Sequence, residues 1–202
     1  MAAEELTLVD GRRARRDRNR AAVIDAMFSL LDEGVVPPPT EAIAARAGVS
    51  VSSIFRYFES LDDLQAQTIE RHFERFAPLF EIPSIGAGSL EDRIDRLVGA
   101  RIELYRSIAP VARLARSRSL DHARVADALA KTRTSFAGQI RVHFATEVAR
   151  LTRPQSDDLV ALVDTLTSFE SWDLLRSTHD RSDRLIRRAW TAGIRRLVAH
   201  PA

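Results

Sequence analysis

Hydrophobic residues recur every three or four positions along most of the chain, which is the period of helices that pack one face on a core. The pattern is tightest around the sequence Ala-Gly-Val-Ser at positions 47–50. Apolar residues at helical spacing lie on both sides of this turn, at Ile43, Ala44 and Ala47 before it and at Val49, Ile54 and Phe58 after it. This pattern indicates two short helices packed at a steep angle, a helix-turn-helix.

Polar residues at the ends of these two helices fit the same interpretation. Thr40 and Ser50 are expected to cap the first and second helix, and Gly48 to take the left-handed backbone of the turn. If Ile54 and Phe58 face inward, the helical period turns the remaining residues of the second helix outward or to its rim: Val51, Ser52, Phe55, Arg56 and Tyr57. Such a surface suits a DNA major groove.

The stretch resembles the DNA-binding domain of the TetR (AcrR-type) family of transcriptional regulators, most closely over about residues 16–65. The resemblance is carried by Ile43-Ala44, Ala47-Gly48-Val49-Ser50, Ile54-Phe55-Arg56-Tyr57-Phe58, Ser60 and Leu64. It implies that Thr40, Ser53 and Tyr57 hold phosphates. From the chemistry of their side chains we expect Arg56 to read a base, and Val51 and Ser52 to make secondary base contacts. Phe55 and Leu61 stand where the family usually has a phosphate-binding tyrosine and lysine, so we expect fewer backbone contacts.

The basic arm and helix that precede the motif extend the candidate DNA-binding surface. Between Arg12 and Arg20 the chain carries six arginines against one aspartate, and we expect this arm, including Arg16, to lie on phosphates or in the minor groove. A solvated tail and a genome-wide preference for arginine over lysine are the alternative explanations. Helical periodicity from about Asp17 to Glu33 predicts the first helix of a three-helix domain.

Capping sequences and breaks divide the rest of the chain into helices. Ser60 and Asp63 form a capping box that opens a helix over residues 61–80, and the sequence 83–88 is the clearest break. We expect further helices at 90–108, 111–118 after Pro110, 124–151, 157–178 with Ser156 as its cap, and from Ser182 onward. No strand pattern of useful length occurs, so the predicted fold is all-α.

Composition excludes several classes of protein. Of 202 residues, 45% are hydrophobic and none is cysteine, which removes disulfides and thiolate chemistry and fits a reducing compartment. The chain starts without a secretion signal and has no apolar run long enough for a membrane span, so we expect a cytoplasmic protein with no membrane association. Its five histidines show no metal-ligand spacing, and no catalytic motif can be placed. We therefore expect no enzyme activity, no metal and no cofactor.

The predicted domains are an Arg-rich flexible arm at 1–16, a helix-turn-helix DNA-binding domain at 17–62, and a helical ligand-binding and dimerisation domain at 63–202. We expect a homodimer through the last two helices, about residues 157–199, with Trp172 and Trp190 in a four-helix bundle. Alternatively, both tryptophans fill the core of one chain. Gly193 inside the last helix also suggests close approach of another backbone.

A pocket for a small lipophilic or aromatic effector is predicted between the other helices, and its acid group, if it has one, would meet an arginine. The candidate ligand-binding residues are Arg101, Tyr105, Arg113, Phe136, His143, Phe169 and Trp172. Taken together, the sequence predicts a homodimeric repressor that an unidentified effector releases from a palindromic operator. The alternative is a helical ligand-binding or interaction protein of the same fold that no longer binds an operator tightly.

Overall fold

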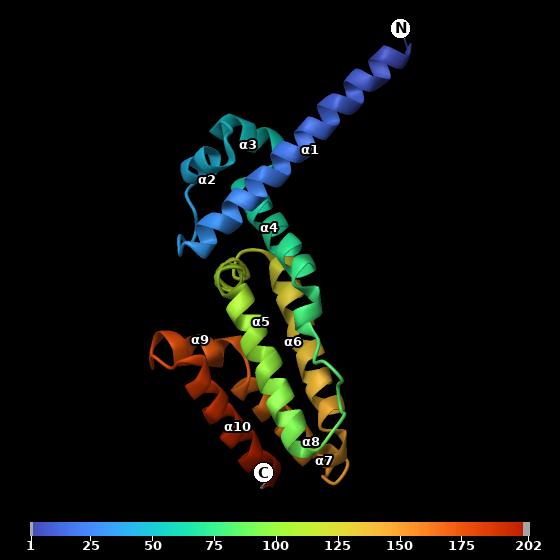
Figure 1. Ribbon diagram of the computed structural model, residues 1–202, viewed down its shortest axis with the longest axis vertical. Coiled ribbons are helices and arrows are strands. Elements are labelled where there is room, and N and C mark those ends of the chain that lie inside the picture. Colours follow the sequence, from blue (N-terminus) through green and yellow to red (C-terminus); the bar gives the residue numbers. More distant parts are fainter. Residues whose placement is uncertain (1, 200–202) are drawn as a thin grey trace. The chain divides into compact units, whose positions relative to one another are not determined.

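The computed structural model describes the backbone of residues 2–199 and the side chains from Arg13 onward within that range. All regular elements in the described part of the chain are helices, as predicted (Figure 1). None of the described helices is long and apolar enough to cross a membrane. The chain divides into two compact units, one made of residues 1–75 and 110–125 and the other of residues 76–109 and 126–202.

Four helices form most of the first unit: α1 (Ala2–Asp32), α2 (Thr40–Ala47), α3 (Val51–Tyr57) and α4 (Leu61–Arg75). Side chains from all four are fully buried in its core, among them Met27, Leu31, Ile43, Ile54 and Leu64. The helix α1 crosses α2 and contacts α3 and α4 as well (Figure 1). The second helix of the motif is thus held against a small apolar core by its inner face.

The predicted start of the first helix is wrong. We expected a helix from about Asp17 after a flexible arm, whereas α1 begins at Ala2 and runs without a break through the arginine-rich stretch. Arginine is a good helix former, and alternation with alanine and asparagine leaves no residue there that would end a helix. Arg13, Arg15, Arg16 and Arg18 are exposed on this helix.

The turn between α2 and α3 has the geometry that its sequence predicts, with one exception. Gly48 has φ 67° and ends α2 in the left-handed conformation, and the Ser50 hydroxyl accepts a hydrogen bond from the Ser53 N–H at 3.2 Å. Thr40 is not a cap, because it is already the first helical residue of α2 and its N-cap is Pro39. Proline tolerates this position since its fixed φ suits a helix start.

The second unit contains the 3₁₀ turn η1 (Ala77–Phe80) and helices from α5 (Leu90–Arg118) to α10 (Asp183–Ala199). Between them lie α6 (Ala123–His143), α7 (Ala145–Val148), α8 (Arg153–Leu166) and α9 (Phe169–Ser177). The last residues of α5 and the first of α6 belong to the first unit. Within the second unit α10 packs along α8 and also contacts α9.

Several predicted helix boundaries in this half of the chain are wrong. Pro110 does not interrupt α5, because buried residues on both sides of it, including Ile108 and Val111, hold the helix together against the cost of the proline. The helix expected to run from 124 to 151 ends at His143. The helix expected at 157–178 breaks after Leu166, where the Ser168 hydroxyl accepts a hydrogen bond from Ser171 N–H at 3.1 Å and starts α9.

The cap of α8 also differs from the prediction. Ser156 is buried inside the helix and accepts a hydrogen bond from Arg141 at 2.8 Å. The N-cap is Thr152, which forms a capping box with Gln155, and Pro154 lies in the first turn.

Both tryptophans belong to the core of one chain, which corrects their predicted role in a dimer interface. Trp172 is buried and Trp190 is fully buried, and the Trp190 indole N–H donates to the Ser171 hydroxyl at 3.3 Å. The close approach at Gly193 is also internal, because a Cβ there would lie 2.7 Å from Leu166 Cδ2 of α8. The alternative that these residues fill the monomer core is the one that the structure supports.

Candidate nucleic-acid interface

The outward face of α3 carries the side chains that its helical period predicts, except that Tyr57 is buried. Ile54 and Phe58 are buried in the core, while Ser52, Phe55 and Arg56 are exposed and Val51 and Ser53 are half-buried. Phe55 has 52% of its surface exposed, which is unusual for a phenylalanine beside a well-packed core. Each of these five side chains can therefore reach a partner molecule without unfolding the helix.

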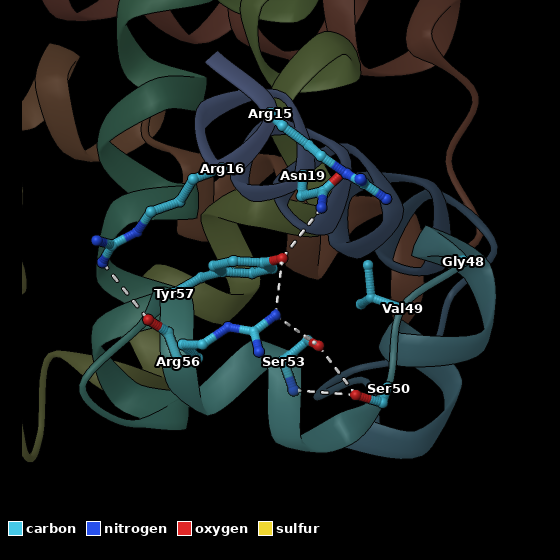
Figure 2. Close-up of a pocket in the computed structure, with 9 residues that line it drawn as sticks. All are labelled: Arg15, Arg16, Asn19, Gly48, Val49, Ser50, Ser53, Arg56 and Tyr57. Atoms are coloured by element: carbon cyan, nitrogen blue, oxygen red, sulfur yellow. Dashed lines mark hydrogen bonds between the residues drawn. The ribbon is translucent and has the colours of Figure 1, made fainter. Parts of the chain in front are cut away.

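A basic groove lies where α1 meets the turn before α3, and Figure 2 shows its nine lining residues. Its volume is about 680 Å³, and three of its lining residues, Arg15, Arg16 and Arg56, are arginines. The other lining residues are Asn19, Gly48, Val49, Ser50, Ser53 and Tyr57, so no carboxylate lines it. An open groove with three guanidinium groups and several hydroxyls matches the chemistry of a phosphate backbone.

Hydrogen bonds across the groove connect α1 with α3 (Figure 2). The Asn19 side chain donates to the Tyr57 hydroxyl at 3.0 Å, and Arg56 Nη2 donates to the same hydroxyl at 3.3 Å and to the Ser53 hydroxyl at 3.2 Å. Arg16 reaches the Arg56 carbonyl at 3.5 Å. These hydrogen bonds, that of Asn19 first, lower the pKa of the Tyr57 hydroxyl. The tyrosine therefore fixes the position of α3 against α1 through its hydroxyl.

The structure brings together most of the predicted DNA-binding residues and adds two that we did not include. Arg16, Ser53, Arg56 and Tyr57 line the groove, and Val51, Ser52 and Phe55 lie on the same short helix, whereas Thr40 lies at the start of α2 and does not line the groove. Arg15 and Asn19 were missed as individual residues. The basic run signalled Arg15, but only the packing of α1 on α3 identifies Asn19.

The predicted ligand-binding residues fall into separate groups. Tyr105, Phe169 and Trp172 form an aromatic cluster in the second unit, with ring centroids of Tyr105 and Phe169 5.6 Å apart, and the Tyr105 hydroxyl donates to the Thr167 carbonyl at 2.8 Å. The Arg101 guanidinium carbon lies 3.5 Å from the ring centroid of Phe136. Arg113 is exposed and is assigned to the first unit, unlike the other six candidates.

His143 has a structural role that argues against its predicted contact with a ligand. Its Nδ1 accepts a hydrogen bond from the Gly86 N–H at 3.0 Å, and its Nε2 donates to the Arg93 carbonyl at 2.8 Å. Burial lowers the pKa of the ring, which keeps it neutral and suited to this pair of bonds. Beside it, Arg93 and Glu147 form a buried ion pair at 2.7 Å. Together these residues attach the connection at 83–88 to α5 and α6.

Comparison with known proteins agrees with the geometry of the first unit. Residues 34–68 match the family model described as bacterial regulatory proteins, tetR family. The chain carries a TetR-family DNA-binding domain. The chain is also 30% identical over 90 residues to the HTH-type transcriptional repressor KstR of Mycolicibacterium smegmatis. That match spans 44% of this chain and 44% of KstR.

Solved structures share the fold of the chain beyond its TetR-family domain. A transcriptional regulator from Rhodococcus sp. Rha1 superposes with a TM-score of 0.66 and 18% identity, covering 91% of this chain and 96% of the other. The multidrug binding protein EbrR, complexed with imidazole, gives a TM-score of 0.60 at 19% identity, covering 94% of this chain and 92% of its own. At these identities the similarity establishes the fold alone.

Proposed function

We propose that this chain is a homodimeric transcriptional repressor that binds a palindromic DNA operator and leaves it when a small lipophilic or aromatic effector binds. The TetR-family match of residues 34–68 and the similarity of the chain to a repressor support the regulatory role. The observation that carries the proposal is the basic groove beside α3, where three arginines and the hydroxyls of Ser50, Ser53 and Tyr57 gather without a carboxylate. Residues 17–62 would bind DNA together with arginines of the preceding stretch 1–16, and residues 63–202 would bind the effector and the second chain.

Roles within the interface follow from exposure and chemistry. Arg56 is our candidate for reading a guanine edge, since a guanidinium forks onto O6 and N7, and the exposed Ser52 and half-buried Val51 would make secondary base contacts. Arg15, Arg16, Ser53 and Tyr57 would hold phosphates and fix the register. In a dimer the two α3 helices would enter successive major grooves about 34–36 Å apart.

A route for the effector signal is supported by contacts of α4 with residues 110–125 of the first unit. Arg118 and His122 approach Asp62 at 3.6 and 3.5 Å, and Arg124 pairs with Glu70 at 2.7 Å. These three residues lie at the end of α5 and the start of α6, whose remaining turns belong to the other unit. An effector that displaces α5 or α6 would thus move α4 and change the spacing of the two α3 helices.

Binding to DNA at two salt concentrations tests the proposal. The DNA would be the intergenic segment upstream of the chain's own gene, with a scrambled duplex of equal length as control. Four phosphate contacts, from Arg15 and Arg16 of each chain of a dimer, would give a slope of about −4 in a plot of log K against log salt, with a clear preference for the native sequence. Equal and weak binding to both duplexes would instead support the alternative, a ligand-binding protein of the same fold without tight operator binding.

A further inference from the structure

The second unit contains a buried arginine whose charge is not compensated. Arg101 on α5 has 1% of its surface exposed, and its Nε and Nη2 atoms have no hydrogen-bond partner among the described residues. No carboxylate in the described part of the chain forms an ion pair with it. A buried charge without a partner costs several kcal/mol, so proteins retain one mainly where it has a function.

The surroundings of Arg101 are apolar and aromatic on one side. Its guanidinium stacks on Phe136 of α6, whose ring in turn stacks on Phe80 with centroids 6.0 Å apart. Tyr105 follows one turn later on α5 and contacts the rings of Phe169 and Trp172. A planar cation that lies on an aromatic ring keeps the edge of its N–H groups available for an anion in the same plane.

Two more unsatisfied polar atoms occur on the neighbouring helices. Gln139 lies one turn beyond Phe136 on α6, and its Nε2 donates to the Phe80 carbonyl at 3.0 Å while its Oε1 has no partner. The Trp172 indole N–H on α9 also lacks a partner, although the side chain is buried. Buried polar atoms are normally hydrogen-bonded, so three unsatisfied side chains in one core mark a place where a polar ligand would supply what is missing.

The carboxylate of Asp164 on α8 is the negative group that competes for Arg101. Asp164 is half-buried, and its electrostatic interaction with Arg101 is offset by burial, which raises the pKa of this carboxyl. Glu81 also attracts Arg101, more weakly than Asp164 does, and is exposed. Arg101 is thus attracted to two carboxylates without forming a direct bond to either, which leaves the guanidinium fork available.

We propose that Arg101 anchors the carboxylate of a small-molecule effector, with the apolar or aromatic body of that molecule packed against Phe136 and Tyr105. This inference rests on the proposed function only in assigning effector binding to the second unit. A carboxylate matches the guanidinium fork with two parallel N–H···O bonds and would neutralise the buried charge. The effector is therefore an organic acid rather than a cation or a neutral molecule.

The test measures the melting temperature of the full-length protein with a panel of simple acids and their matched amides. The acids are hexanoate, benzoate and 3-phenylpropionate at millimolar concentration and neutral pH, each compared with its uncharged amide. We expect at least one acid to raise the melting temperature by about 2 °C or more while its amide does not. If no acid stabilises the protein more than its amide, the proposal is wrong.

Three variants separate an anchor from a structural arginine. Arg101→Met keeps the volume but removes the charge, so it should weaken acid binding at least about tenfold and should not lower the melting temperature of the ligand-free protein. Arg106→Met, an exposed arginine on the same helix that pairs with Asp183 at 3.4 Å, should leave acid binding unchanged. Asp164→Asn removes the competing carboxylate and should strengthen acid binding.

The outcomes are distinct from those of the DNA-binding experiment. Loss of acid binding in both arginine variants, or unchanged binding in Arg101→Met, would overturn the assignment of Arg101. In a third outcome, Arg101→Met or Asp164→Asn lowers the melting temperature of the ligand-free protein, and Asp164→Asn does not increase its affinity for acids. This would show that Arg101 and Asp164 form an internal pair and would overturn the proposal. Acid binding by a chain that does not bind DNA would leave this inference standing and refute the proposed function.

Discussion

Arg56 has hydrogen-bond partners on its own helix before any DNA is bound. Its Nη2 bonds the hydroxyls of Ser53 and Tyr57, and its guanidinium lies over the Tyr57 ring at 5.3 Å. Exposed hydrogen bonds of this kind contribute about 1 kcal/mol or less, which two charge-assisted bonds to a guanine would exceed. The observed arrangement therefore holds the side chain beside the groove without preventing it from reaching a base.

Replacing Arg56 should alter sequence preference, not just affinity. Arg56→Ala should cost about 1–3 kcal/mol at one operator base pair and leave binding to other sequences nearly unchanged. Binding is measured on the operator and on a set of single-base variants. Tyr57→Phe is the comparison, because loss of a phosphate-binding hydroxyl should weaken operator and random DNA alike. If Arg56→Ala lowers affinity equally for both DNAs, Arg56 is a phosphate contact.

His72 makes stability depend on pH. Its ring is buried against Phe28 with centroids 5.3 Å apart, and burial, followed by the charge of Arg75, lowers its pKa from 6.5 to about 4. Between these values the unfolded chain binds a proton that the folded chain does not. The neutral, buried ring of His72 therefore contributes its full stabilising free energy above about pH 6.5. As the pH falls toward 4, the free energy of unfolding decreases by up to about 3 kcal/mol.

Urea unfolding followed by circular dichroism between pH 4 and pH 7 would measure this dependence, and His72→Phe should reduce its slope. The slope should not vanish, because burial lowers the pKa of His143 in the same direction. The exposed His179, replaced by Gln, serves as the control and should leave the slope unchanged. An unaltered slope in His72→Phe would mean that the buried ring does not carry the effect.

At the scale of single elements, α3 is short and depends on its cap. With only seven residues it cannot be stable alone, and the Ser50 hydroxyl satisfies one of its free N–H groups. Ser50→Ala should lower the free energy of unfolding by about 1 kcal/mol. Thr40→Ala is the matched control and should have little effect, because the structure gives Thr40 no capping bond. Equal losses in urea unfolding would contradict this difference.

The pairing of α8 with α10 depends on the absence of a side chain at position 193. An alanine Cβ there would meet Leu166 Cδ2 at 2.7 Å, whereas a Cβ at Gly138 in α6 would have no atom within 4 Å. Gly138→Ala should therefore stabilise the protein by about 0.5–1 kcal/mol through helix propensity. In Gly193→Ala the clash of the new Cβ with Leu166 should outweigh the gain in helix propensity and destabilise the protein by about 1 kcal/mol. Thermal unfolding of the two variants would show the opposite signs.

At the scale of single elements, the sequence predicts the helix caps and turns that depend only on a few neighbouring residues. Ser50, Gly48 and the Ser60–Asp63 pair act within one helix turn. The structure confirms the first two and the Ser60 cap, whereas the Asp63 carboxylate accepts from the Glu59 N–H and not from the Ser60 N–H. The break before Phe169 was missed because the apolar period continues across it. At Pro110 we predicted a helix break that does not occur, because packing of the surrounding turns of α5 outweighs the local tendency of proline to end a helix.

At the scale of the whole molecule, the all-helical fold and the position of the helix that we propose to bind DNA were predictable, but the division into two units was not. Nothing in the sequence of residues 110–125 shows that they pack with the first unit, since both units present apolar faces at the same helical period. For the same reason Trp172 and Trp190 could not be assigned to a core or to an interface. A buried tryptophan has the same sequence pattern in either case.

Because both tryptophans are buried in one chain, a dimer through residues 157–199 would use other side chains. Leu162 on α8 and Leu174 on α9 are large apolar residues with 43% and 53% of their surfaces exposed. Burying one such leucine stabilises an interface by about 1.5–3 kcal/mol, and a substitution occurs in both subunits of a twofold-symmetric homodimer, so its effect is doubled. Leu162→Glu should therefore weaken dimerisation at least about a hundredfold and weaken operator binding with it.

Sedimentation velocity of the unaltered protein and of Leu162→Glu over a range of concentrations would measure this loss of dimerisation. Val142→Glu is the control, because Val142 is 55% exposed on α6 and lies outside the proposed interface. It should change neither the dimer nor the affinity for the operator. A dimer that survives Leu162→Glu would exclude α8 from the interface, and dissociation by Val142→Glu alone would place it on α6. If the unaltered chain is monomeric while bound to a palindromic operator, the two reading helices cannot be held at a fixed spacing by a preformed dimer, and the proposed release by an effector loses its physical basis.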